Sequence, residues 1–224
     1  MTDRSIRVPV VRGRSREVLE RAASQFLSKH APTCLAAPRP VPVLRFFDRV
    51  LPKFFGFNPA VDTSPPGFEG RPAPHGLEGL TDMEAKIVWL PPQTYARLEA
   101  GGGRPKFTAA HEIGHVVLHR NELHTSAPWP NGGVVFARRT EIDPYEDPEW
   151  QANNFASALL MPATALVQLE RTHGEVTDTL IHETLEVSLT SARLRLKIFN
   201  QYRAVLVGVA SEFLRGQARP PSSG

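Results

Sequence analysis

The sequence is poor in cysteine and has no long uninterrupted apolar run. Its 224 residues include one cysteine, Cys34, so no internal disulfide can form, whereas small secreted domains commonly carry cysteine pairs. The apolar runs fall well short of the roughly 20 residues that span a bilayer, and the basic N-terminus lacks the apolar core of a signal peptide. These absences exclude a disulfide-stapled scaffold and predict a cytoplasmic protein with no membrane partner. We expect Cys34 to be an inert small side chain.

Positive charge is concentrated near the N-terminus. Residues 1–45 carry nine Arg and Lys against three acidic residues, although the net charge of the whole chain is only +3. Such an arm suits contact with nucleic acid or an acidic partner. No aromatic residue lies among the arginines before Phe26, which weakens a base-stacking interpretation. We therefore favour a basic, flexible, solvated tail over residues 1–14 and leave direct nucleic-acid binding open.

Proline and phenylalanine gather in the next part of the chain. Residues 31–75 hold ten of the 21 prolines, which disfavours long regular elements there. Five of the twelve phenylalanines lie between residues 46 and 57. This phenylalanine cluster suits either a short core helix with its aromatic side turned inward or an exposed groove for a partner peptide. We favour the core helix.

Hydrophobic periodicity predicts an α+β fold in which most helices follow a small sheet. Strand-like runs at 77–80 and 85–90 predict a hairpin whose turn lies at Thr81–Asp82. The other predicted elements are helices over 15–30, 106–119, 148–161, 163–172, 177–186 and 189–202, and a candidate strand over 133–137. No internal repeat is visible.

The sharpest chemical signal is the segment His111-Glu-Ile-Gly-His115, inside the predicted helix 106–119. Residues four apart lie on the same side of a helix, so the two imidazoles can converge on one zinc ion. Glu112 lies about 100° around the helix from His111 and suits a base that takes a proton from the attacking water and delivers it to the departing amine. The helix is apolar nearly all round and is therefore expected to be buried, where His and Glu need partners. We favour a metal site over a surface helix with two chance histidines.

A catalytic zinc needs a third protein ligand and an open position. His119 is an obvious candidate, but a straight helix places it about 12 Å along the axis from His111. That separation is too large for both to bind one ion, so we expect His119 to cap the helix end or to pack nearby.

Five downstream carboxylates are alternatives: Glu141, Asp143, Glu146, Asp147 and Glu149. Glu149 is favoured because it lies inside a predicted helix, after an N-cap at Asp147. Ala152 and Ala156 form a small-residue stripe on its side of that helix, where a second helix can approach closely. The alternative role for Glu149 is a first-turn carboxylate that interacts only with the helix dipole.

Two longer segments carry a family resemblance. They are Phe107-Thr-Ala-Ala-His-Glu-Ile-Gly-His-Val-Val-Leu-His119 and Glu149-Trp-Gln-Ala-Asn-Asn-Phe-Ala156, the latter followed by Leu159-Leu-Met-Pro162. Together they resemble the ImmA/IrrE family of metallopeptidases, and the resemblance extends back over the hairpin to about residue 75. It implies a zincin-like peptidase core of the gluzincin type, with His111, His115 and Glu149 as zinc ligands and Glu112 as the catalytic base.

The resemblance also implies a substrate and a domain organisation. Members of the family cleave helix-turn-helix repressors and so release stress-response or mobile-element genes, which implies an endopeptidase acting on a regulatory protein. The expected division is a tail (1–14), a zinc peptidase domain (15–172, with the Pro-rich segment 31–75) and a helix-turn-helix-like C-terminal element (173–224). The alternatives are a non-catalytic zinc-binding regulator and a toxin–antitoxin or prophage interaction protein.

Three details stay open at this point. Arg193, Arg195 and Lys197 could face DNA or a protein, but we favour solvated basic side chains, with the core completed by Leu189, Leu194, Leu196 and Ile198. The group that stabilises the oxyanion is not assigned; its candidates are His124, His173 and Tyr145. The ion is expected to be Zn²⁺, although Mn²⁺ or another divalent metal suits the same ligands.

Overall fold

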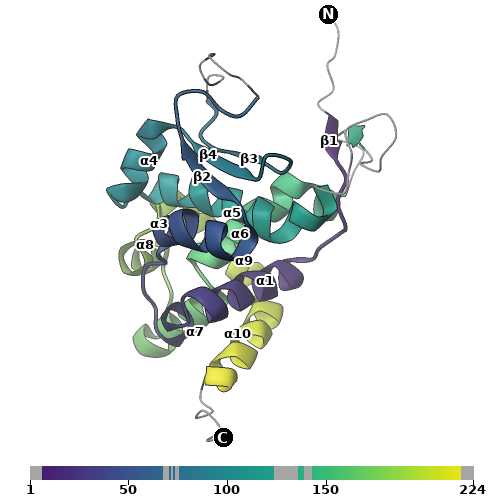
Figure 1. The fold of residues 1–224 in the computed structure, drawn as a ribbon. Helices are drawn as coiled ribbons and strands as arrows, with labels where there is room; N and C mark the ends of the chain where they lie inside the picture. Colours follow the sequence, from purple (N-terminus) through teal and green to yellow (C-terminus); the bar gives the residue numbers. More distant parts are fainter. Residues whose placement is uncertain are drawn as a thin grey trace, which may run out of the picture.

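Helices form most of the protein, and a small sheet covers one side of them (Figure 1). The structure is a computed structural model that describes residues 7–67, 71, 73, 76–123, 136–138 and 143–217. Its elements are β1 (Arg7–Pro9), α1 (Arg16–His30), α2 (Thr33–Ala36), α3 (Val43–Arg45), η1 (Phe46–Phe55), β2 (Asn58–Val61), β3 (Leu80–Asp82), β4 (Ile87–Leu90), α4 (Pro92–Glu99), α5 (Gly103–Leu123), β5 (Phe136–Arg138), η2 (Pro144–Glu146), α6 (Pro148–Leu160), α7 (Ala163–His173), α8 (Asp178–Leu185), α9 (Leu189–Gln201) and α10 (Arg203–Gln217). The predicted α+β class is confirmed. No helix in the described ranges has the length and apolar character needed to cross a membrane.

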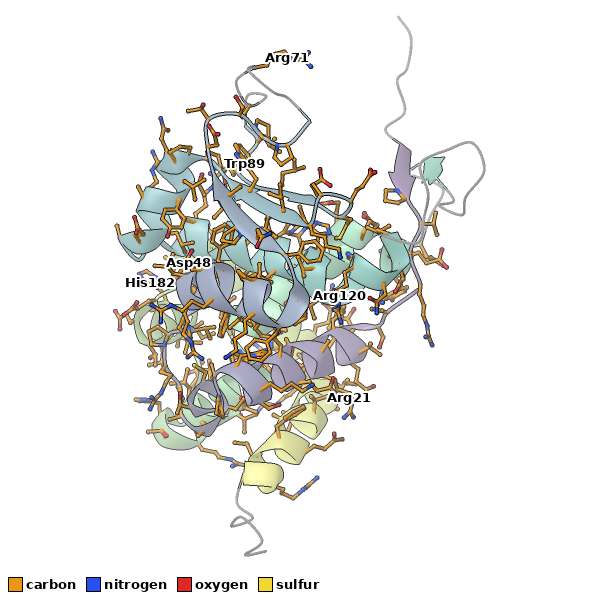
Figure 2. All side chains as sticks on the ribbon, in the orientation of Figure 1. Arg21, Asp48, Arg71, Trp89, Arg120 and His182 are labelled. Carbon is orange, nitrogen blue, oxygen red and sulfur yellow. The ribbon has the colours of Figure 1, made fainter. Side chains whose placement is uncertain are left out.

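The sheet has the order β2-β4-β3 within the described part of the chain. β2 is parallel to β4, whereas β3 is antiparallel to it and lies at one edge. The central strand is buried, and the indole nitrogen of Trp89 donates to the carbonyl oxygen of Asp62 at 3.0 Å (Figure 2). β2 lies in the Pro-rich segment, where only long regular elements were disfavoured, and it has four residues. Pro59 is tolerated there because β2 is also an edge strand.

The hairpin is confirmed, but its predicted turn at Thr81–Asp82 is wrong. Both residues belong to β3, and Asp82 pairs with Ile87. The Asp82 carboxylate accepts hydrogen bonds from the amides of Glu84 and Ala85 at 2.9 and 2.8 Å, so it organises a turn that begins after the strand. This shift leaves Thr81 on the strand that faces α5, with consequences for the site.

The helix α5 lies between the sheet and the remaining helices (Figure 1). It begins earlier and ends later than predicted, since it runs from Gly103 to Leu123. On its far side it packs against α6, and α6 in turn packs against α1. Gly114 allows the approach of α5 to α6, because a Cβ atom there would lie 3.1 Å from a ring carbon of Phe155 and 3.3 Å from Ala152 Cα.

The phenylalanine cluster is a core helix, as predicted. Phe46 and Phe47 lie in η1, a π-helix, and are fully buried. Phe55 at its end contacts the guanidinium of Arg120, whose carbon lies 4.9 Å from the ring centroid (Figure 2). Phe54 alone is clearly exposed among the cluster's five rings. Cys34 is buried in α2, and this burial raises the pKa of its thiol.

The predictions for the C-terminal basic segment are partly wrong. Arg195 is 2% exposed and forms an ion pair with buried Glu20 of α1, at 2.7 Å. Leu194 is 57% exposed, whereas it was expected in the core, and Leu189 is also exposed. The physical reason is that the face of α9 turned toward α1 carries the arginine, and the carboxylate of Glu20 compensates its charge there. Leu196 and Ile198 do pack against the core, as expected.

Segments near both ends of the described chain contact the helices. Within the predicted tail, residues 1–6 lie outside the described residues, but Arg7–Pro9 pair antiparallel with β5, and Arg14 contacts α5 and α6. This differs from the expected solvated tail. At the other end, α10 packs against α7 and α1, and Arg21 of α1 pairs with Glu212 (Figure 2). The helices α4 and α10 were not among the predicted elements.

Candidate metal centre

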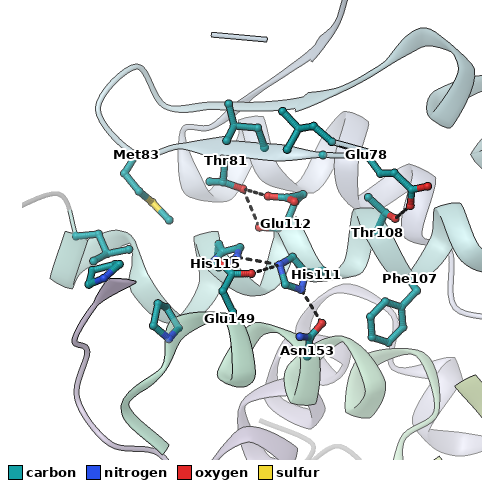
Figure 3. Close-up of a pocket in the computed structure, with 16 residues that line it drawn as sticks. Glu78, Thr81, Met83, Phe107, Thr108, His111, Glu112, His115, Glu149 and Asn153 are labelled. Carbon is teal, nitrogen blue, oxygen red and sulfur yellow. Dashed lines mark hydrogen bonds and ion pairs between the residues drawn. The ribbon is translucent and has the colours of Figure 1, made fainter. Parts of the chain in front are cut away.

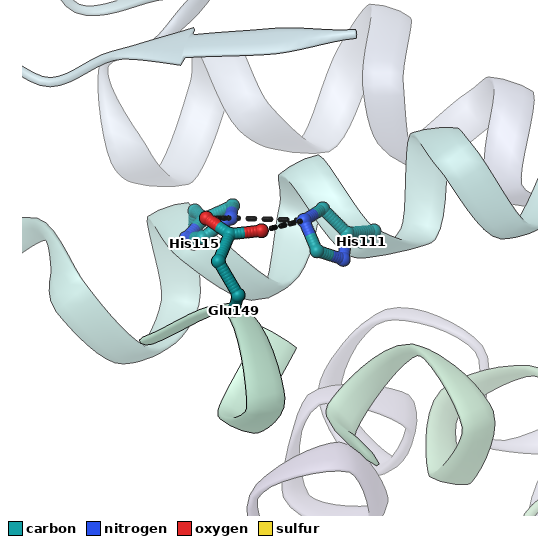
Figure 4. Close-up of side chains that lie close together, drawn as sticks. All are labelled: His111, His115 and Glu149. Carbon is teal, nitrogen blue, oxygen red and sulfur yellow. Dashed lines mark hydrogen bonds and ion pairs between the residues drawn. The ribbon is translucent and has the colours of Figure 1, made fainter. Parts of the chain in front are cut away.

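Three of the predicted site residues meet between α5 and α6 (Figure 4). The Nε2 atoms of His111 and His115 lie 3.0 Å apart. The Glu149 carboxylate reaches both rings, with Oε2 3.2 Å from His111 Nε2 and Oε1 3.3 Å from His115 Nε2. One donor atom from each residue therefore lies within 4.8 Å of the other two. Within the described residues, these three form the group of His, Cys, Asp and Glu side chains close enough to share an ion.

Local sequence explains how α6 presents Glu149. Asp147 is the N-cap of α6, as predicted, and its carboxylate accepts from the Glu149 amide at 2.9 Å. Glu149 therefore lies in the first turn, and the close approach at Gly114 brings that turn to α5. Ala152, from the predicted small-residue stripe, contributes to this approach. Asp147 itself serves as a cap and is not part of the group of three.

The carboxylate and the imidazoles change one another's pKa values. The contacts of its carboxylate with the imidazole rings of His111 and His115 hold the pKa of Glu149 far below its ordinary value, against the opposing effect of burial. Burial by itself would lower the pKa of His111, but the hydrogen bond to Glu149 and the charges of Glu112 and Glu149 outweigh it, so the pKa is raised. The cluster thus concentrates negative charge next to two nitrogen donors, which is what a divalent cation needs.

Glu112 lies on the opposite wall, next to the edge strand β3 (Figure 3). The hydroxyl of Thr81 donates to Glu112 Oε2 at 2.7 Å. Gly79 leaves room for the carboxylate, because a Cβ atom there would lie 2.8 Å from Glu112 Oε1. The Glu112 side chain is buried, so Thr81 of β3 and Gly79 just before β3 set its position rather than solvent.

A cavity of about 490 Å³ connects all four site residues. Its walls come from β3 and the preceding loop, α5 and the start of α6 (Figure 3). The apolar residues that line it are Pro9, Leu77, Leu80, Met83, Phe107, Leu123 and Pro148. The cavity therefore combines an apolar lining with the four ionisable side chains of the site.

Several residues of the site were not singled out from the sequence. Asn153 Oδ1 lies 3.0 Å from His111 Nδ1, and its spacing of four from Glu149 on α6 is a signal that could have identified it. Thr81 and Gly79 carried no such signal, because their contact with Glu112 joins segments about 30 residues apart.

The remaining candidates lie elsewhere. His119 is fully buried one turn beyond His115, and α5 continues to Leu123, so His119 packs nearby rather than capping the helix end. Burial, followed by the charge of His115, lowers the pKa of His119 to about 3. Of the oxyanion candidates, Tyr145 and His173 do not line the cavity, and His124 lies outside the described residues, as does Glu141. Asp143 and Glu146 do not belong to the group of three.

One family model matches the part of the chain that contains the site. Residues 102–197 match a peptidase family model described as the IrrE N-terminal-like domain, a stretch that includes all four site residues. A solved structure, a Mycobacterium tuberculosis transcriptional regulator, aligns with 78% of this chain at 14% identity and a TM-score of 0.45. The alignment covers 45% of that regulator, so this chain spans less than half its length. No curated protein matches the chain.

Proposed function

Because residues 102–197 match the IrrE N-terminal-like peptidase domain, we propose that the chain is a zinc-dependent endopeptidase of the ImmA/IrrE family. The observation that carries the proposal is the meeting of His111, His115 and Glu149 on one side of a cavity that Glu112 lines on the other. We further propose that its substrate is a regulatory protein, specifically a helix-turn-helix transcriptional repressor.

The donor set fits a divalent cation. Two imidazole nitrogens and a carboxylate with a depressed pKa face one point, and Asn153 accepts from His111 Nδ1, which leaves the Nε2 lone pair of that ring free for an ion. His111, His115 and Glu149 would hold Zn²⁺, or Mn²⁺ in its place. When bound, the ion polarises the scissile carbonyl and acidifies the attacking water.

Glu112 provides the proton transfers. Its carboxylate accepts a proton from the attacking water and then delivers that proton to the nitrogen of the departing amine. The hydrogen bond from Thr81 to Oε2 keeps the carboxylate turned in one direction, and burial keeps bulk water from competing for it. A purely structural metal site has no use for such a base and commonly fills its fourth position with Cys or His. This contrast favours catalysis over a non-catalytic zinc regulator.

The cavity supports a polypeptide as the substrate class. Leu80 and Thr81 belong to β3, which is an edge strand within the described sheet, and both line the cavity. An extended peptide can add to such an edge through its backbone, while the apolar lining receives alternate side chains. This arrangement would carry a scissile bond past Glu112 and Glu149.

The test is cleavage of a helix-turn-helix repressor, with a repressor encoded beside this gene as the first choice where the genome contains one. Purified full-length protein with one equivalent of zinc is incubated with that repressor, and fragments are identified by mass spectrometry. We expect a single limited cleavage by the wild type. Glu112→Gln should bind zinc with unchanged affinity and cleave at least about 10²-fold more slowly, because a positioned base contributes roughly that factor or more.

One control variant and two possible outcomes separate the substrate, the activity and the mechanism. Glu84→Gln, on the turn after β3 and outside the cavity lining, is the matched variant and should cleave at the wild-type rate. An intact repressor together with cleavage of other unfolded polypeptides would reject the substrate but keep the activity. Undiminished cleavage by Glu112→Gln would reject the mechanism.

A further inference from the structure

A line of buried hydrogen bonds leads from His115 away from the cavity into the interior. His115 Nδ1 lies 3.2 Å from Nδ1 of His119, and the other ring nitrogen of His119, Nε2, lies 3.1 Å from Gln151 Oε1. Both His119 and Gln151 are completely buried. The line starts on α5, at the ring that faces Glu149, and ends on α6.

The contacts of Gln151 determine which way its amide points. Its nitrogen, Nε2, faces two backbone carbonyl oxygens, those of Arg12 (2.9 Å) and Tyr145, and donates to both. Its oxygen, Oε1, accepts from the guanidinium of Arg14 at 2.8 Å as well as facing His119. The reversed amide would set a donor against the guanidinium and an oxygen against two carbonyls, so only one orientation satisfies all four neighbours.

This orientation determines the protonation of both histidine rings. A carbonyl oxygen can only accept, so His119 Nε2 carries the ring hydrogen and, in the neutral ring, Nδ1 carries the lone pair. His115 Nδ1 must then donate to His119 Nδ1. The hydrogen of His115 is therefore on Nδ1, and its lone pair is on Nε2, the atom that faces His111 and Glu149.

We infer that His119 and Gln151 are positioning residues that hold His115 in the tautomer and ring orientation able to bind the ion. The inference rests on the proposed function and extends it to two side chains that do not touch the cavity. The two ligand rings have different hydrogen-bond partners. His111 contacts the exposed residue Asn153. His115 contacts buried His119, which contacts Gln151, and Gln151 in turn accepts from Arg14 of the N-terminal segment. Partners of this kind typically change metal affinity about 10–100-fold when removed.

The test measures both the tautomer and the metal affinity. Imidazole ¹⁵N correlation spectra of the metal-free, full-length wild type at one fixed pH should show the His115 hydrogen on Nδ1. Zinc affinity is then measured by competition with a chromophoric chelator. His119→Phe fills the space without an acceptor and should weaken zinc binding about 10–100-fold. His119→Asn keeps an acceptor near the position of Nδ1 and should recover most of that loss.

The outcomes are distinguishable. His173→Phe, at the exposed end of α7, is the matched control and should bind zinc like the wild type. Equal zinc affinity of the wild type and His119→Phe overturns this inference and leaves the proposed function intact. A His115 hydrogen found on Nε2 in the wild type overturns it even if His119→Phe does not fold. A wild type that binds no zinc overturns the proposed function, and this inference with it.

Discussion

At the residue scale, the position of Glu112, the proposed base, depends on two contacts with β3 and the residue that precedes it. Thr81 donates to Glu112 at 2.7 Å, and Gly79 is small enough to leave space for the same carboxylate. Neither residue supplies chemistry of its own. Together they hold the buried carboxylate of Glu112 in one orientation. A general base needs such a fixed orientation for efficient proton transfer.

Thr81→Val tests this confinement. Valine has the shape of threonine and suits a strand, so the fold should persist while the hydrogen bond to Glu112 is lost. We expect cleavage to slow about tenfold, equivalent to about 1.4 kcal/mol of transition-state stabilisation, with unchanged zinc affinity. Thr81→Ser retains the hydroxyl and should stay near the wild-type rate. A wild-type rate for Thr81→Val would show that the hydroxyl does not orient the base.

At the element scale, the candidate metal centre depends on the close contact between α5 and α6. His111 and His115 belong to one helix and Glu149 to the other, so their meeting depends on the separation of the two helices. Gly114 lies on α5 within this contact, where Phe155 and Ala152 leave no room for a larger side chain. The distance from Glu149 to the histidines is thus set by the packing around this glycine.

Gly114→Val should move the helices apart. Overpacking of this kind costs about 1–3 kcal/mol of unfolding free energy, and we expect zinc affinity to fall at least about tenfold as Glu149 withdraws. Urea denaturation and chelator competition measure the two effects. Gly208→Val is the matched control, since nothing lies within 4 Å of a Cβ atom at Gly208 in α10, and it should leave zinc binding unchanged. Wild-type zinc affinity for Gly114→Val would contradict the role given to this contact.

At the scale of the whole molecule, one buried ion pair joins segments from both ends of the chain. Glu20 of α1 pairs with Arg195 of α9 at 2.7 Å and also accepts from the Ala163 amide at 2.8 Å. Arg195 in turn donates to the carbonyl oxygen of Met161 at 2.9 Å. The pair therefore links α1, the end of α6, the start of α7 and the C-terminal helices into one body.

Arg195→Met should destabilise the entire protein. Removing one partner leaves the buried Glu20 carboxylate uncompensated, which typically costs about 3–5 kcal/mol. We expect the urea midpoint to fall accordingly, in a single transition monitored by circular dichroism. Arg193→Met removes an exposed arginine that pairs with Asp178 on the surface and should have little effect. Equal stability of the two variants would show that the buried pair does not hold the ends together.

The features that the sequence determined by itself are local. The spacing of His111 and His115 and the N-cap at Asp147 could both be predicted. Each depends on neighbours within one or two turns, where the period of the α-helix decides which side chains share a face. The core position of the phenylalanine cluster was predictable for the same reason, because its aromatic spacing marks one buried side.

Tertiary structure decided everything that depends on partners distant in the chain. Arg195 is buried and Leu194 exposed because a carboxylate 175 residues away from Arg195 faces that side of α9, which no periodicity can reveal. The contact of Thr81 with Glu112 and the line from His115 to Gln151 likewise join separate segments. Local spacing orients side chains around one helix axis, but the distance between two helices follows from the packing of both. The sequence could therefore identify Glu149 as a candidate third ligand, but only the packing of α5 against α6 brings its carboxylate to the two histidines.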